Sequence, residues 1–340
     1  MNAATQPLET EVVIVGAGPV GLFTVFQCGM LKMRCHVVDA LEAIGGQCSA
    51  LYPEKPIYDI PAFPRVEGLE LIERLEQQAA PFHPIYHLGQ QVVAVTRLAD
   101  DRFQVETSAG TTILCRAVVL AAGPGAFGPN RPPLKGLEAY EGTSVFYMVR
   151  RREDFRGKRV VIAGGGDSAV DWAVSLAELA ASVQVIHRRD KFRAAPDMVE
   201  RMQALTQAGK VELVVPYQLS ALEGEGGRLS AVIAADLDGQ ERRLDADVLL
   251  PFFGLAAKLG PIAEWGLEIE KHLVRVDPIG CETNQPGIYA IGDLAQYPGK
   301  LKLILQGFSE AAMAAHHMYG RVFPGEALHF EHSTTKGLAV

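Results

Sequence analysis

The sequence predicts an α/β protein built from two Rossmann-like domains of the three-layer ββα type. Three observations support this class: a length of 340 residues with 48% hydrophobic residues, an internal repeat, and a glycine-rich turn at the same place in each copy. A chain of this length corresponds to about two domains, and its composition is sufficient for a full hydrophobic core.

The repeat begins at Glu11 with "EVVIVGAGPVGLFTVFQCGMLKMRCHVVDA" and again at Lys158 with "KRVVIAGGGDSAVDWAVSLAELAASVQVIHRR". Each copy predicts a β-branched strand, a tight turn, a helix and a second strand. A shift of 148 positions pairs Gly16 with Gly164, Gly18 with Gly166 and Gly21 with Ala169. This is the βαβ fingerprint of dinucleotide binding, in which a pyrophosphate lies at the helix N-terminus. Its occurrence twice in the same context makes a chance match improbable.

The two copies differ at the end of the second strand. The first has Asp39, which is suited to accept hydrogen bonds from an adenosine ribose. The same shift of 148 positions places His187 there, followed by Arg188 and Arg189. Cations at this location remove repulsion of a 2′-phosphate and provide bidentate donors for it, which favours NADPH over NADH. A solvated basic loop is the alternative interpretation, and the register with Asp39 argues against it.

Three further stretches suggest a flavin for the first copy. Residues 44–64, "IGGQCSALYPEKPIYDIPAFP", form a loop whose Gln47 and Tyr52 can hydrogen-bond to and stack on a flat polar ring. Residues 118–130, "VVLAAGPGAFGPN", predict a strand that ends in a glycine–proline hinge between domains. "GIYAIGDLAQ" predicts a strand that delivers Asp293 to the start of a helix.

These stretches predict that one domain interrupts the other. We expect a discontinuous FAD-binding domain over residues 1–122 and 254–340 and an NADPH-binding domain over residues 123–253.

Composition argues against several other classes of protein. The net charge of −8 argues against a dedicated nucleic-acid binder, which needs a basic surface. Residues 12–31 lack charge, yet glycines and a proline interrupt them and Glu9 and Glu11 precede them, so we expect neither a membrane span nor a signal peptide, and a cytoplasmic location. The five cysteines include no C-x-x-C pair, so we expect free structural thiols and no metal site, with Cys48 the one nearest a cofactor.

Several motifs carry a family resemblance. The Gly16 fingerprint, the "GGQ" loop, the "AAGPGAF" hinge, "GGGDSAVDW", "HRRDKFRA" and "IGD" together resemble the two-domain flavoprotein reductases of the thioredoxin-reductase structural type. Among these, the chain is most similar to the thioredoxin-reductase-like ferredoxin (flavodoxin)–NADP⁺ reductases, and the similarity covers nearly its whole length. The resemblance implies FAD and NADPH as cofactors, ferredoxin or flavodoxin as partner, and a homodimer. It also implies hydride transfer between nicotinamide C4 and flavin N5, followed by one-electron steps.

The resemblance also implies the site residues. Those expected to contact FAD are Gly16, Gly18, Asp39, Gln47, Tyr52, Val92, Phe127, Asp293 and Thr334. Those expected to contact NADPH are Gly165, Gly166, Asp167, Ser168, Arg188, Arg189 and Arg193. Tyr52 would stack on one face of the flavin, with His332 near the other, and no acid–base or dithiol residue is expected. Core packing of Val92 and Phe127 and a solvated His332 are the alternative interpretations.

The electron acceptor stays open at this point. The slot before the second fingerprint, "SVFYMVRRREDFRGKR", holds no cysteine, so electrons must pass from the flavin to an outside acceptor. Basic residues within 150–159, or Lys300 and Lys302, are candidates for docking an acidic carrier, although a solvated face explains them equally well. Alternative functions are an NADPH-dependent flavin reductase or diaphorase acting on quinones, iron chelates or a separate disulfide protein, and an FAD- and NADPH-binding redox sensor.

Overall fold

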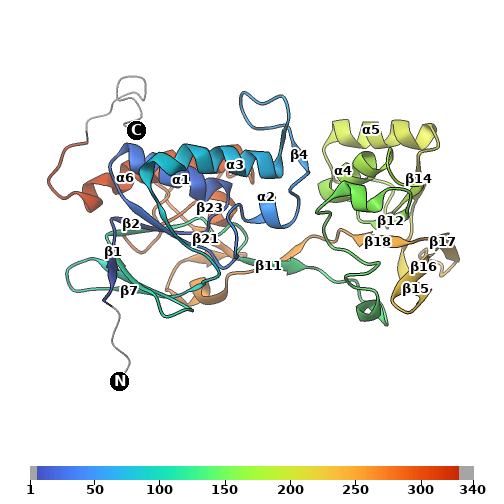
Figure 1. Ribbon diagram of the computed structural model, residues 1–340, viewed down its shortest axis with the longest axis horizontal. Helices are drawn as coiled ribbons and strands as arrows, with labels where there is room; N and C mark the ends of the chain where they lie inside the picture. Colours follow the sequence, from blue (N-terminus) through green and yellow to red (C-terminus); the bar gives the residue numbers. More distant parts are fainter. Residues whose placement is uncertain (1–5, 329–340) are drawn as a thin grey trace. The chain divides into compact units, whose positions relative to one another are not determined.

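The chain folds into two units, each containing one copy of the repeat (Figure 1). The computed structural model describes residues 6–328, without the side chains at positions 126–129 and 255–257. The first unit ends at Phe127 and resumes at Ala257, and the second spans Gly128–Ala256. These borders lie a few residues after the expected ones, within two strands that pair with each other. These strands are β11 (Ala126–Pro129) and β19 (Leu255–Lys258).

The first unit is organised around a five-stranded parallel sheet in the order β22-β10-β2-β3-β6. Its strands are β2 (Val12–Val15), β3 (Cys35–Val38), β6 (Ile85–His87), β10 (Ala117–Leu120) and β22 (Ile288–Ala290). Every residue of β2, β3 and β10 is buried, as expected for strands covered on both faces.

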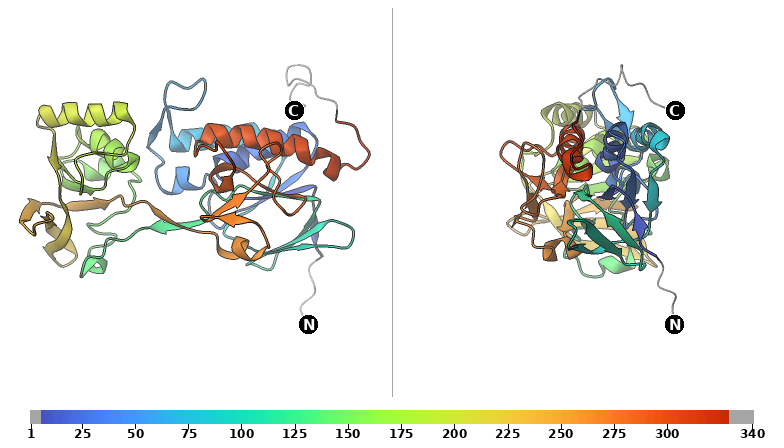
Figure 2. Two further views of the ribbon diagram at one scale, coloured as in Figure 1. Left: turned by 180° about the vertical axis from the view of Figure 1, so that it is seen from behind. Right: turned by 90° about the vertical axis from the view of Figure 1, so that its left-hand side faces the viewer.

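Two layers cover this sheet. One face carries α1 (Pro19–Met30), α3 (Gly68–Ala79) and α6 (Ile304–Val322), with α6 beside α1 (Figure 2). The other face carries a sheet of β1 (Leu8–Glu9), β9 (Thr112–Cys115), β8 (Phe103–Thr107) and β7 (Val92–Arg97). Val12 and Ile14 pack with the helices, whereas Val13 packs with the second sheet, so residues alternate between the faces of β2.

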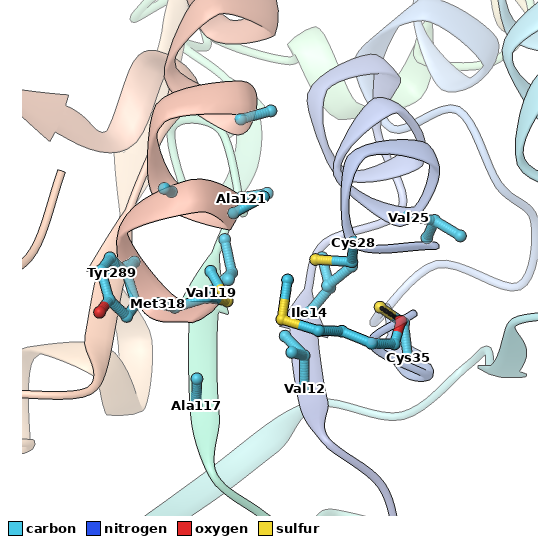
Figure 3. Close-up of a cluster of buried hydrophobic side chains, with 14 of the residues drawn as sticks. Val12, Ile14, Val25, Cys28, Cys35, Ala117, Val119, Ala121, Tyr289 and Met318 are labelled. Atoms are coloured by element: carbon cyan, nitrogen blue, oxygen red, sulfur yellow. Dashed lines mark hydrogen bonds between the residues drawn. The ribbon is translucent and has the colours of Figure 1, made fainter. Parts of the chain in front are cut away.

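Sulfur-containing side chains contribute to the core between the helices and the sheet. Figure 3 shows Cys28 of α1, Cys35 of β3 and Met318 of α6 around Ile14. All five cysteines are unpaired and buried, which confirms the prediction of free structural thiols.

The second unit repeats the three-layer plan on a smaller scale. Its parallel sheet, in the order β14-β13-β12-β18, comprises β12 (Arg159–Ala163), β13 (Ser182–Ile186), β14 (Val211–Val214) and β18 (Val248–Pro251). The helices are α4 (Asp167–Leu176) and α5 (Pro196–Gln207), and the antiparallel sheet comprises β15 (Gln218–Glu225), β16 (Arg228–Ala235) and β17 (Glu241–Asp245). Val161 of β12 shares a core with Val232 of β16, so this sheet forms a third layer. The predicted ββα class is therefore confirmed.

The remaining elements are short. They are α2 (Gln47–Ala50), β4 (Pro56–Ile57), β5 (Val66–Glu67), β20 (Ile269–Glu270), β21 (Leu273–Arg275), β23 (Ala295–Gln296) and the 3₁₀ turns η1 (Ala80–Phe82), η2 (Leu137–Ala139), η3 (Arg152–Phe155), η4 (Gly260–Glu264) and η5 (Gly292–Leu294). The expectation that Asp293 begins a helix is met only by the single 3₁₀ turn η5. Ala295 then becomes extended because β23 pairs with β21, and α6 begins only at Ile304.

Two kinds of feature are absent from residues 6–328. No helix there is both long and apolar enough to cross a bilayer. No group of three or more His, Cys, Asp or Glu side chains in that range is placed to bind a metal ion.

A pair of histidines, with His36 buried and His87 half-buried, predicts a pH-dependent stability. His36 of β3 lies with its Nδ1 atom 3.1 Å from Nε2 of His87 in β6. Burial, with His87 and Arg34 nearby, lowers the pKa of His36 from 6.5 to about 4. The unfolded state therefore binds more protons between these values, and stability should fall as pH falls through them. We expect a loss of about 2 kcal/mol in the free energy of unfolding between about pH 7 and about pH 5.

Urea unfolding at both pH values measures this loss. His36→Leu should remove most of the dependence, whereas His272→Asn, a change at an exposed histidine, should leave it unchanged. An equal pH dependence in wild type and His36→Leu would contradict the assignment.

Candidate functional site

A cavity of about 310 Å³ lies in the first unit at the carboxyl ends of the parallel strands. Its walls come from the glycine turn after β2, the segment after β3, residues 121–125 after β10, and η5 after β22. Ligands of doubly wound α/β sheets bind at this edge, because the strand ends diverge there and the helix N-termini point toward the ligand.

The glycine turn of the first copy has the shape that a pyrophosphate needs. Gly16 has φ +112°, and a Cβ atom there would lie 2.4 Å from the Ala121 carbonyl oxygen. A Cβ atom at Gly21 would lie 1.9 Å from the Gly16 oxygen, so α1 can approach β2 only with glycine at this position. Gly18, the N-cap of α1, faces open space, and no side chain caps the helix. The first amides of α1 are thus free to bind an anion.

Asp39 follows β3 and lines the same cavity. Its Oδ2 atom accepts a hydrogen bond from the Ala17 amide at 2.7 Å, and its Oδ1 atom accepts one from the Leu41 amide at 2.8 Å. Burial raises the pKa of Asp39, and these two bonds oppose the shift. Each carboxylate oxygen keeps a second lone pair, so the group can still accept hydrogen bonds from ribose hydroxyls. The turn and this acid together fit the adenosine diphosphate part of FAD.

The other predicted flavin residues gather at the same cavity from separate elements. Gln47 opens α2, Val92 opens β7, Asp293 lies in η5, and Tyr52 lies one turn beyond α2. Val92 is 4% exposed, so it is both a core residue and a wall of the cavity. Burial raises the pKa of Tyr52, so its hydroxyl remains protonated. Seven of the nine residues expected to contact FAD therefore meet here; contact itself remains a prediction.

Three predicted residues lie outside what the structure describes. Phe127 belongs to β11, but its side chain is not described. His332 and Thr334 lie beyond residue 328. Their roles remain predictions.

Cys48 also lines the cavity and is 1% exposed. Burial raises the pKa of this thiol to about 11, so it is protonated at neutral pH. A protonated, buried thiol is a poor nucleophile, which agrees with a structural role.

Sequence patterns missed other residues of the cavity wall. Gln90 lines it from the segment before β7, Ile262 from η4, and Ile304 from the start of α6. These segments lie far apart in the sequence and meet through packing of the outer layers. The apolar run "LKLIL", residues 301–305, extends into the start of α6 and is the one local signal that marks a partly exposed apolar surface there.

A buried ion pair supports the wall of the cavity at η5. Glu310 of α6 accepts hydrogen bonds from the Gly292 amide at 2.7 Å, the Tyr297 hydroxyl at 2.5 Å and Lys300 Nζ at 2.5 Å. The side chains of Lys300 and Glu310 are 3% and 0% exposed. Lys300 is therefore not available to dock a protein partner, and its suggested surface role is wrong.

The other group of suggested docking cations, within residues 150–159, is partly neutralised. Arg156 pairs with Glu153 at 2.8 Å, and Arg159 pairs with Asp247 at 2.6 Å. Such exposed pairs suit a solvated face better than a strongly positive docking surface.

The second copy of the fingerprint builds a comparable turn in the second unit. Gly164 has φ +155°, and a Cβ atom there would lie 2.6 Å from the Phe252 carbonyl oxygen. Gly166 is the uncapped N-cap of α4 and faces open space, as Gly18 does in the first unit. Residues Asp167 and Ser168 form the first turn of α4. An anion can therefore bind this helix N-terminus as well.

The basic cluster lies on the loop that follows β13. His187 comes directly after this strand, in the position that Asp39 occupies after β3, so the predicted register is confirmed. Arg188, Arg189 and Arg193 are exposed, and none of them forms an ion pair with another described residue. Burial lowers the pKa of His187, and the three arginines lower it further. Unpaired guanidinium groups around a neutral imidazole fit a bound phosphate.

Comparison with known proteins agrees with this architecture. A family model described as pyridine nucleotide-disulphide oxidoreductase matches residues 10–318. Crystal structures of Lactococcus lactis and T. acidophilum thioredoxin reductases match with TM-scores of 0.79 and 0.80 at 22% identity, over 92% of this chain and 99% and 98% of theirs. These structural matches support the two-domain fold.

Two sequence relatives are much closer. The chain is 65% identical over 330 residues to a protein of Paramagnetospirillum magneticum named ferredoxin–NADP reductase, covering 97% of this chain and 98% of the relative. It is 64% identical over 337 residues to a protein of the same name from Rhodospirillum rubrum, covering 98% of each. The chain therefore belongs to the pyridine nucleotide-disulphide oxidoreductase family of enzymes and, within it, to the thioredoxin-reductase-like ferredoxin–NADP reductases.

Proposed function

We propose that the protein is an FAD-dependent oxidoreductase that transfers electrons between NADPH and ferredoxin. The observation that carries this proposal is the contrast between two equivalent βαβ units. Asp39 follows the second strand of the first unit, whereas His187, Arg188 and Arg189 follow that of the second. An acid suits the unphosphorylated ribose of FAD, and arginines suit the 2′-phosphate of NADPH. One chain thus offers two different dinucleotide sites.

The first unit would hold FAD along its cavity. The pyrophosphate would lie on the amides at the start of α1, the ribose on Asp39, and the flavin ring near Gln47, Tyr52 and Asp293. Val92, Phe127 and Thr334 complete the proposed set, with His332 of the C-terminal tail covering the ring on the face opposite Tyr52. The protein's task is to orient this ring and to keep water from it.

The second unit would hold NADPH by its adenosine end. The amides at Gly165, Gly166, Asp167 and Ser168 suit the pyrophosphate, and Arg188, Arg189 and Arg193 suit the 2′-phosphate. When bound, FAD would supply the redox chemistry, which is hydride transfer between nicotinamide C4 and flavin N5, release of the proton and one-electron steps to the carrier, while Gln47, Tyr52 and Asp293 would hold the ring in place.

The electron acceptor is proposed to be a separate one-electron carrier. The second unit, Gly128–Ala256, contains no cysteine, so a dithiol relay of the kind that precedes the second fingerprint in thioredoxin reductases has no place here. The names of the two relatives support ferredoxin as the carrier, and flavodoxin, another one-electron carrier, is the alternative. By family resemblance we also propose a homodimer in which the tail of one subunit covers the flavin of the other.

Purification followed by steady-state kinetics tests the function. We expect a yellow protein with one FAD per chain that oxidises NADPH in preference to NADH and reduces ferredoxin, followed with a terminal dye. A colourless protein, or equal use of the two nucleotides, would contradict the proposal. Faster reduction of quinones or iron chelates than of ferredoxin would indicate a diaphorase, and slow flavin reduction by NADPH would indicate a sensor.

A further inference from the structure

The loop of residues 187–195, called the arginine loop below, is joined to the glycine turn of the second unit by hydrogen bonds. We propose that Asp167 is a positioning residue that holds the arginine loop in the conformation that binds a 2′-phosphate. The inference rests on the proposed binding of NADPH by this unit, and it assigns Asp167 a role in nucleotide selection through the loop.

Two hydrogen bonds join the loop to the turn. The Ala195 amide donates to Asp167 Oδ1 at 2.9 Å. The Arg193 amide donates to the Gly165 carbonyl oxygen at 2.7 Å. The loop therefore folds back over the N-terminus of α4 and does not extend into solvent.

A ring contact adds a third connection. A Cβ atom at Gly165 would lie 2.2 Å from Cε1 of His187, so the imidazole covers this glycine closely. The His187 ring also lies 5.1 Å from the Phe192 ring, which closes the loop on itself. Gly165 is thus required by the packing of His187 as well as by any approach of a cofactor.

The location of Asp167 makes a purely passive role improbable. It is the first residue of α4, where the cofactor phosphates are expected, and a carboxylate there repels them. The hydrogen bond that Asp167 accepts from the Ala195 amide explains why an acid stands there in spite of this repulsion. The bond joins elements that are separate in the sequence and fixes the end of the segment that carries the three arginines.

The first unit has an equivalent hydrogen bond, but there the carboxylate lies on the segment after the second strand and the amide lies in the glycine turn. There Asp39, on the segment after the second strand, accepts a hydrogen bond from Ala17 in the glycine turn at 2.7 Å. The repeat shift of 148 positions places Pro19 at the position of Asp167, and proline has no carboxylate to offer. In each unit one carboxylate ties the turn to the segment beyond the second strand. In the second unit that acid lies on the helix, which leaves the strand end free for cations.

Binding of nucleotide fragments tests this role without any flavin chemistry. Adenosine 2′,5′-bisphosphate and adenosine 5′-monophosphate, titrated calorimetrically into the purified full chain, isolate the contribution of the 2′-phosphate. Asp167→Ala should weaken the bisphosphate about tenfold, the size expected for one hydrogen bond to a charged group, and change the monophosphate less than about twofold.

Asp167→Asn separates the hydrogen bond from the charge. The amide oxygen can accept the same bond from Ala195, so this variant should retain or improve affinity for the bisphosphate, since repulsion is removed. Asp190→Ala, which removes an exposed carboxylate from the same loop, is the matched control and should not weaken it.

A substitution at Ala195, whose amide donates the hydrogen bond to Asp167, tests the same bond independently. Ala195 has φ −53°, close to the value that proline imposes, so Ala195→Pro removes the amide hydrogen without a change of φ. It should reproduce the loss seen in Asp167→Ala, and the double variant should be no weaker than either single one. Additive losses in the double variant would overturn the inference.

The remaining outcomes separate the inference from the proposed function. Equal weakening in Asp167→Ala and Asp167→Asn would show that charge and not the hydrogen bond matters, which overturns the positioning role alone. If the wild-type chain binds both fragments equally, the 2′-phosphate assignment of the arginine loop fails, and this inference fails with it.

Discussion

Lys300→Met should lower the free energy of unfolding by about 3–5 kcal/mol, the usual loss when one partner of a buried ion pair is removed. The change leaves the Glu310 carboxylate fully buried, with hydrogen bonds from the Gly292 amide and the Tyr297 hydroxyl but without its counter-ion. Chemical denaturation of the FAD-bound protein, followed by circular dichroism, measures the loss.

The same variant should bind FAD less tightly. Glu310 fixes the Gly292 amide, and Gly292 and Asp293 form part of the cavity wall. A buried carboxylate without its lysine is expected to draw water into the site, and this water would loosen η5. Fluorescence of released flavin, measured against protein concentration, gives the FAD dissociation constant.

Two controls make this prediction specific. Lys302→Met removes an exposed lysine two positions away and should change the free energy of unfolding by less than about 0.5 kcal/mol. The double variant Lys300→Met with Glu310→Gln leaves no buried charge and should recover about half or more of the loss. Equal destabilisation by Lys300→Met and Lys302→Met would show that the pair is not buried in solution.

Arg188→Ala should raise the KM for NADPH about 10- to 100-fold and leave the KM for NADH nearly unchanged, because a charge-assisted hydrogen bond to phosphate contributes about 1.5–3 kcal/mol. Arg188 is exposed and forms no ion pair within residues 6–328, so the change removes no contact that stabilises the fold. Steady-state kinetics with both nucleotides and a dye acceptor measure the ratio.

A control variant must show that the increase in KM does not come from the loss of one positive charge anywhere on the unit. Lys210→Ala removes one exposed positive charge from the same unit and should leave both KM values unchanged. The difference between NADPH and NADH should also shrink as salt concentration rises, since screening weakens exposed charge pairs. Equal increases in KM for both nucleotides would refute the assignment to the 2′-phosphate.

The repeat made most of the fold predictable. Apolar β-branched runs around two glycine turns indicate strand, turn, helix and strand, and the structure confirms each in both copies. These elements are local, because glycine conformation and side-chain periodicity act within a few residues. The secondary structure of the less regular segments was harder to predict from the sequence. Asp293 lies in a single 3₁₀ turn and not at the start of a helix, because the pairing of β23 with β21 joins residues distant in the sequence.

The candidate site residues that belong to a sequence motif could be predicted from the sequence. Gly16, Gly18 and Asp39 belong to one fingerprint, and Arg188 and Arg189 follow from its second copy by register. Gln90 and Ile262 carry no such signal, since they reach the cavity only when the outer layers pack.

Lys300 illustrates the limit of inference from sequence most clearly. In a run that also contains Lys302 it has the pattern of a solvent-exposed cation, and the residue that neutralises it lies on the following helix. Burial is a property of the packed chain, so charge composition alone cannot separate a docking lysine from a buried one.

The amino-acid sequence alone was enough to predict two βαβ units with glycine turns and which of them carries cations instead of an acid after its second strand, because a glycine turn and one charged position act locally. Folding decided which distant side chains line the cavity of the first unit, that Lys300 is buried against Glu310, and that the Ala195 amide donates a hydrogen bond to Asp167. These contacts join residues from different elements, and their energies exist only after the layers have packed and water has been excluded.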